Sequence, residues 1–152
     1  MAITPTPGHH ARQADDIGEQ LRSLGVPERA AAEKRYLKSS LRHLGTAVPE
    51  VRRVARKAAG TIGSHCELVT LARALWEAPV HERRLCAVFL LEARVDLIGP
   101  GDLPLIEEFV RGAKTWALVD DLAGALLGEL VVAHPEVAEA FDAWATDADF
   151  WI

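Results

Sequence analysis

The sequence has few of the residues that build disulfide scaffolds, metal centres or membrane spans. Its 152 residues include only two cysteines, Cys66 and Cys86, and these form no Cys-x-x-Cys element and no zinc-binding spacing. The six histidines follow no metal-ligand pattern, and no apolar run approaches the ~20 residues that cross a bilayer. The first ten residues lack the basic end and apolar core of a signal peptide. We therefore expect reduced, buried thiols, no metal, no cofactor, no membrane contact and a cytoplasmic location.

Strand-like alternation of apolar and polar residues is also missing, and the apolar residues instead recur at helical spacing. With 49% hydrophobic and 26% charged residues, the chain has the composition of a globular domain. Prolines recur at the starts of apolar-periodic stretches, where the absent N–H of proline would have no partner. The predicted helices cover residues 11–24, 27–43, 49 onward, 65–77, 79–97, 102–112, 115–128 and 135–145.

Successive helices joined by short turns predict an all-α fold of stacked antiparallel pairs, a HEAT-like α-solenoid. We expect residues 1–10 to be a flexible N-terminal segment and residues 11–152 to form one helical-repeat domain. Asp147 is expected to cap a further helix whose first residues would be 148–152, and the sequence stops there in an apolar turn without a capping signal. The domain is therefore expected to be truncated at its C-terminal end, and the exposed apolar turn would favour self-association.

The charge is divided unevenly along the chain. Residues 1–60 hold 11 Lys and Arg against 6 Asp and Glu, a balance of +5, whereas residues 61–152 hold 6 against 16, a balance of −10. Many of the cations recur at four-residue spacing on two predicted helices, which is typical of a band that binds phosphates. The alternative is an ordinary solvated face. The candidate DNA-binding cations are Lys34, Arg35, Lys38, Arg42, Arg52, Arg53, Arg56 and Lys57.

The stretch 113–128 holds the candidate catalytic residues. On a helix, four leucines would form one apolar ridge, while Trp116 and Asp120 would lie on a different side with two glycines after them. A ligand-contacting helix presents an aromatic ring beside a carboxylate in this way. The alternative is structural, with Trp116 closing the core and Asp120 complementing the helix dipole. The leucines are Leu118, Leu122, Leu126 and Leu130, and the glycines are Gly124 and Gly128.

With these elements placed, residues 30–152 resemble the AlkD-type DNA alkylation repair glycosylases, a family built of HEAT-like repeats. The most specific matches are the Trp-x-x-Val-Asp element ending at Asp120 and the element running from Leu127-Gly128 to His134-Pro-Glu136. The other matching segments, in the family's order, are Arg35–Lys38, Leu44–Arg53, Leu75–Pro79, Leu105–Glu108, Lys114–Asp120 and Trp144–Trp151.

The resemblance implies a function and roles for three residues. Asp120 matches the catalytic aspartate of the family, Trp116 the aromatic residue beside it, and Tyr36 a tyrosine that lines the DNA-facing surface. Ala117 departs from the pattern, because the family usually has an acidic residue there. The family's catalytic arginine and second active-site tryptophan have no counterpart within these 152 residues, which puts activity in doubt.

The expected activity is hydrolysis of the N-glycosidic bond of cationic alkylated purines in double-stranded DNA. A cationic purine is already a good leaving group, so the main task is to stabilise the oxocarbenium-like sugar and to position water. The resemblance implies that this DNA glycosylase works without flipping the base. The alternative is a catalytically silent HEAT-like scaffold that binds DNA or a protein partner.

Overall fold

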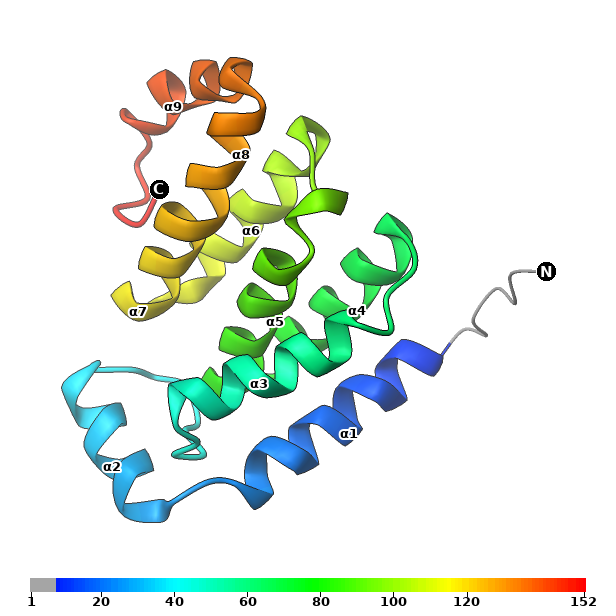
Figure 1. The fold of residues 1–152 in the computed structure, drawn as a ribbon. Coiled ribbons are helices and arrows are strands. Elements are labelled where there is room, and N and C mark those ends of the chain that lie inside the picture. The colour runs from blue at the N-terminus through cyan, green and yellow to red at the C-terminus, as the bar shows by residue number, and fades with distance from the viewer. Residues whose placement is uncertain (1–7) are drawn as a thin grey trace.

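Residues 8–152, the part of the chain described by the computed structural model, form stacked helices (Figure 1). A π-helical segment (Asp121–Leu127) joins α7 to α8, and short 3₁₀ turns lie at Val95–Leu97, Pro100–Asp102 and Pro135–Ala138. This all-α architecture confirms the expected HEAT-like stack. The α-helices are α1 (His9–Ser23), α2 (Pro27–Tyr36), α3 (Val48–Ala59), α4 (His65–Glu77), α5 (His81–Ala93), α6 (Leu103–Ala113), α7 (Trp116–Asp120), α8 (Gly128–Ala133) and α9 (Glu139–Trp144).

The helices form two layers that share one core (Figure 1). In one layer α3 packs on α5, and α5 packs on α7 and the π-helical segment. In the other layer α1 packs on α4, and α6 contacts α4 through the rings of Phe109 and Trp76. Contacts between α4 and α5 and between α6 and α7 join the layers. Helices α1, α3, α4, α5 and α6 therefore each bury one apolar face against their neighbours, as the helical spacing of their leucines and valines requires. None of the helices in residues 8–152 has the length and apolarity to cross a membrane.

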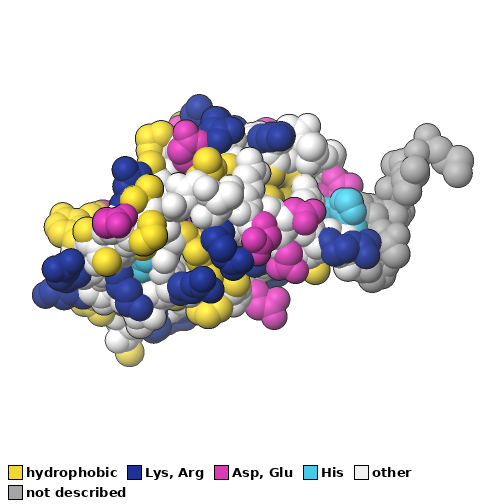
Figure 2. All heavy atoms as spheres, turned by 90° about the horizontal axis from the view of Figure 1, so that it is seen from below, with side chains coloured by type: hydrophobic (Ala, Val, Ile, Leu, Met, Phe, Trp, Pro, Cys, Tyr) yellow, Lys and Arg dark blue, Asp and Glu magenta, His cyan; other side chains and the backbone are white. Residues whose placement is uncertain are grey.

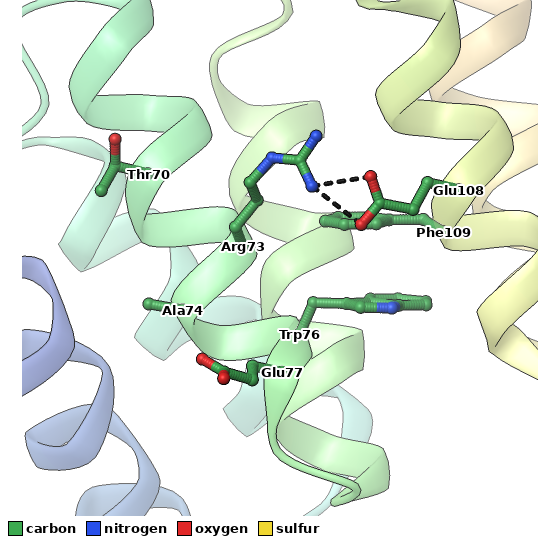
Figure 3. A pocket seen from close by; sticks show the side chains of 7 residues that line it. All are labelled: Thr70, Arg73, Ala74, Trp76, Glu77, Glu108 and Phe109. Carbon is green, nitrogen blue, oxygen red and sulfur yellow. Dashed lines mark hydrogen bonds and ion pairs between the residues drawn. The ribbon is translucent and has the colours of Figure 1, made fainter.

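A stacked aromatic pair joins α4 to α6 in the second layer (Figure 3). The indole of Trp76 lies parallel to the ring of Phe109, with centroids 4.1 Å apart. Arg73 donates to Glu108 across the same junction at 2.6 and 2.8 Å. The hollow beside them, of about 420 Å³, is lined by these side chains and by Thr70, Ala74 and Glu77. The ring stack and the Arg73–Glu108 pair therefore join α4 to α6.

The two cysteines differ in environment. Cys86 is fully buried in α5, and burial raises the pKa of its thiol to about 12. Cys66 is exposed in the first turn of α4, so the expectation that both thiols are buried was wrong for this residue. The exposure arises because Cys66 lies on the polar side of α4, opposite the face that buries Leu68 and Leu71.

The N-terminal boundary differs from the expected one. Residues 1–7 of the expected flexible segment 1–10 lie outside the described residues, whereas His9 and His10 already form the first turn of α1. Gly8 precedes them with a φ of 98°. Such a left-handed conformation is easily adopted by glycine, and it sets the start of α1 two residues before residue 11.

The second helix is much shorter than the predicted 27–43 and ends at Tyr36. Lys38 takes a left-handed φ of 48°, and the buried Ser39 hydroxyl accepts a hydrogen bond from the Leu41 N–H at 3.1 Å. The chain then runs extended, and Arg42 pairs through its backbone with Pro79 and His81. Serine side chains that bond the nearby backbone in this way compete with helix formation, so residues 37–47 form an irregular segment.

The C-terminal residues form turns in place of the expected capped helix. The Asp147 carboxylate accepts the Asp149 N–H at 2.7 Å, and Asp149 in turn accepts the Trp151 N–H at 3.0 Å. Asp147 also receives the Arg111 guanidinium of α6 at 3.0 Å. These Asx-type bonds hold the backbone in turns, so the prediction of a helix from residue 148 was wrong. Phe150 is 90% exposed.

The Arg111–Asp147 pair makes stability depend on pH. Hydrogen bonds from Arg111 lower the pKa of Asp147 from 3.8 to about 2, so the pair stabilises the fold above 3.8 and the stabilisation is lost as pH falls through 2. We expect Asp147→Asn to melt below the wild type at neutral pH, with the difference shrinking between pH 4 and pH 2. Thermal melts across this range, with the exposed Asp142→Asn as control, measure the difference. A difference independent of pH would contradict the prediction.

Candidate functional site

The predicted leucine ridge is present and faces the core. Its four members are 0–1% exposed, while Trp116 is 44% exposed and Asp120 is exposed on the other side. Gly124 and Gly128 follow on this helix, and a Cβ added to either would meet nothing within 4 Å. The sequence thus placed the buried and accessible sides correctly. Asp120 is not sealed in the interior.

The helix that carries these residues is not a uniform α-helix. Asp121–Leu127 form a π-helical segment between α7 and α8, in which each turn holds more residues than in an α-helix. With α-helical spacing, Leu127 would fall between Trp116 and Asp120 in angle. The wider turns instead bring Leu127 into the core, where it is 6% exposed. The accessible side near Asp120 is therefore left without this leucine.

A groove lies between α2 and α7, and it brings together the three residues with the most specific predicted roles. Tyr36 at the end of α2 is 74% exposed. Its ring meets Trp116 edge to face, with centroids 5.9 Å apart and planes at 82°. The groove has a volume of about 420 Å³. Its lining residues are Glu33, Tyr36, Leu37, Thr46, Val48, His81, Glu82, Leu85, Trp116, Ala117, Asp120 and Asp121.

A second carboxylate lies beside Asp120. Burial raises the pKa of Asp121, Arg52 lowers it and the charge of Asp120 raises it again. Burial likewise raises the pKa of Glu92 on α5, which Arg52 opposes through a hydrogen bond of 2.7 Å. The groove therefore combines the exposed carboxylate of Asp120 with the more buried Asp121, whose pKa burial raises.

Two of the predicted phosphate-binding cations are engaged with acidic partners. Arg52 pairs with Glu92 at 2.7 Å and lies 3.7 Å over the Phe89 ring, and Arg53 pairs with Glu50 at 2.6 Å. The sequence pattern showed no alternating acidic residues beside these arginines, because Glu92 is distant in the chain and Glu50 precedes the basic run. Arg52 thus contributes to packing between α3 and α5. Arg56 and Lys57 are exposed on α3.

The remaining predicted cations lie on α2 and the segment after it. Lys34, Arg35, Lys38 and Arg42 are exposed. Lys34 and Arg42 line a common hollow of about 480 Å³, although the irregular segment and not a continuous helix brings them together. Figure 2 views the molecule from the α1 and α2 side and shows Lys and Arg side chains gathered at the α2 end, with Asp and Glu side chains nearer the middle.

The sequence did not predict that two buried polar residues, His81 and Glu82, line the groove. Glu82 is 1% exposed and His81 6%, and both begin α5. The Glu82 carboxylate accepts the Leu44 and Gly45 N–H groups at 2.7–2.9 Å. The helix start after Pro79 was predicted, but the contacts of Glu82 with residues distant in the chain leave no local pattern.

Comparison with known proteins fits this geometry. A family model described as "DNA alkylation repair enzyme" matches residues 17–152. The chain belongs to the DNA alkylation repair enzymes. The match includes α2, α7 and the groove between them. A search of curated proteins finds no match.

Membership of the repair-enzyme family assigns the chain to DNA alkylation repair in general. It also confirms the family resemblance found through the Trp-x-x-Val-Asp element. The same matched region contains every predicted site residue, from Lys34 to Asp120.

Proposed function

We propose that the chain is a DNA N-glycosylase that hydrolyses the glycosidic bond of cationic alkylated purines in duplex DNA. One observation carries the proposal: Tyr36, Trp116 and Asp120, from two helices 80 residues apart in the chain, line one groove. An exposed aromatic pair beside a carboxylate suits a sugar that becomes positively charged. Neither residue type is needed at this surface for packing.

In this proposal Asp120 supplies the electrostatic stabilisation. As the bond to the cationic purine breaks, its electron pair leaves with the neutral base, and positive charge develops on the deoxyribose. The Asp120 carboxylate offsets that charge and accepts a hydrogen bond from the water that attacks the sugar carbon, and the proton that this water loses as its C–O bond forms passes through the carboxylate to solvent. Trp116 packs against the deoxyribose, and its apolar ring lowers the local dielectric and so strengthens the attraction.

Lys and Arg side chains around the groove would hold the DNA backbone. Exposed cations lie on α2, which carries Tyr36, and on α3, whose Val48 lines the same groove. Phosphate contacts of this kind give affinity without sequence preference. The aromatic rings are exposed at the surface, which suits contact with the sugar from the backbone side. We propose that the lesion stays stacked in the duplex.

The proposal is tested by incubating the protein with N-methylated duplex DNA and measuring free methylpurines by chromatography. The expected result is release faster than the spontaneous rate in a reaction without protein. A 2-aminopurine placed next to the lesion tests stacking, because flipping of the neighbouring base increases its fluorescence. Release no faster than the spontaneous rate would overturn the glycosylase, and a fluorescence increase on binding would overturn the stacked lesion.

A further inference from the structure

A cluster of metal-ligand side chains lies where α2, the irregular segment 37–47 and α5 meet. Glu33 of α2, His43 of the segment and Glu82 of α5 each offer one ligand atom, and these atoms all lie within 4.8 Å of one another. Glu33 and Glu82 also line the groove of Tyr36 and Asp120. The three residues are separated along the chain, which explains why the histidine spacing predicted no metal.

His43 is the unusual member of the cluster because its ring nitrogens have no hydrogen-bond partner within residues 8–152. The residue is 9% exposed, and its ring stacks on His81 with centroids 4.5 Å apart and planes at 10°. Burial lowers the pKa of His43, which favours the neutral ring. A buried polar atom without a partner is costly, and a neutral imidazole nitrogen is a common metal ligand.

The two carboxylates would also gain from a cation. Burial raises the pKa of Glu33, and the charge of Glu82 raises it further. Glu82 is held in place by the Leu44 and Gly45 N–H groups, so it cannot move away from Glu33. A divalent ion between them would offset the repulsion between the two carboxylates and would give a ring nitrogen of His43 a partner.

We propose that Glu33, His43 and Glu82 bind one divalent transition-metal ion of the Zn²⁺ type, which fastens α2 to α5. One imidazole and two carboxylates are ligands that Zn²⁺ accepts, at about 2.0–2.2 Å. The half-buried Glu33 can rotate to shorten the ligand distances. Within the described residues α2 buries no side chain, so such an ion would supply a firm link between this helix and the core. This proposal does not depend on glycosylase activity.

The test measures retention of Zn²⁺ by the full chain after equilibrium dialysis, with metal analysis and a thermal melt of the same samples. We expect one Zn²⁺ ion per chain and a higher melting temperature in its presence. Glu33→Gln removes one ligand at a half-buried position and should weaken binding about tenfold or more. Glu28→Gln, exposed on the same helix, is the matched control and should bind as the wild type does.

Two further variants test whether His43 is a ligand and whether the surface histidines of α1 bind the ion instead. His43→Phe preserves a ring against His81 but offers no nitrogen, so it should lose Zn²⁺ while circular dichroism shows the same helix content. His9→Gln with His10→Gln removes the adjacent imidazoles at the start of α1, which could bind Zn²⁺ at the surface, and should retain the ion. Failure of the wild type to retain Zn²⁺, or equal retention by Glu33→Gln and the wild type, would overturn the site. Neither outcome bears on base release.

Discussion

Asp120→Asn is expected to lower the rate of methylpurine release by about a hundredfold or more, which is typical when a group that stabilises transition-state charge is removed. The amide has the size and shape of the carboxylate but carries no charge, so it cannot offset the positive charge that develops on the sugar. Asp120 is exposed, lines the groove and is not among the buried residues, so the fold should be unchanged. DNA affinity should stay close to that of the wild type.

Single-turnover release from methylated duplex DNA measures the chemical step, and fluorescence anisotropy at several salt concentrations measures binding. The control is Glu129→Gln, an equally exposed carboxylate on α8 that lies outside the groove, and it should release base at the wild-type rate. If Asp120→Asn releases methylpurines as fast as the wild type, Asp120 has no catalytic role. A loss of binding that matches the loss of release would assign Asp120 to DNA affinity.

Gly45→Ala is expected to destabilise the fold by about 3 kcal/mol or more, the range of a strained backbone combined with a steric clash. Gly45 has a φ of 77°. A Cβ at this position would lie 2.1 Å from the Val26 carbonyl oxygen and 2.7 Å from the Ala30 nitrogen. These are backbone atoms, so no side-chain rotation relieves the clash. The Gly45 carbonyl also accepts the Val26 N–H at 3.1 Å, and this bond would be strained.

Thermal unfolding checks this prediction, and a loss of that size corresponds to a decrease in melting temperature of about 10 °C for a domain of this length. Gly99→Ala is the matched control, because Gly99 has a negative φ of −141° and a Cβ there would meet nothing within 4 Å. Its melting temperature should stay within about 2 °C of the wild type. Equal melting temperatures for Gly45→Ala and Gly99→Ala would contradict the prediction, because they would show that the backbone at Val26 and Ala30 moves away from the added Cβ without a loss of stability.

Much of the fold could be predicted from the helical spacing of the apolar residues. The predicted helix 65–77 agrees with α4 at both ends, since Ser64 caps its N-terminus and accepts the Glu67 N–H. The leucine ridge of the 115–128 stretch was equally readable, because burial follows directly from spacing. Pro27 and Pro104 stand at helix starts as predicted. These features depend on residues close together in the chain.

The features that depend on distant residues could not be read from the sequence. Lys34, Lys38 and Arg42 follow one another at helical spacing, yet the helix ends at Tyr36. The chain after it turns to bond the start of α5 through the Arg42 backbone and through the Leu44 and Gly45 N–H groups. The π-helical segment that brings Leu127 inward has no local signal. The meeting of Glu33, His43 and Glu82 likewise arises only when α2 and α5 come together in space.

The attachment of α2 has a consequence for how this repair fold can diversify. The helix carries Tyr36 and several cations, yet none of its side chains is buried, and the Val26 N–H that bonds the Gly45 carbonyl at 3.1 Å attaches its start to the segment 37–47. If α2 contacts DNA as proposed, substitutions of its exposed residues should change recognition of the nucleic acid without a penalty in folding. Selection can then tune substrate preference on this helix separately from the integrity of the domain.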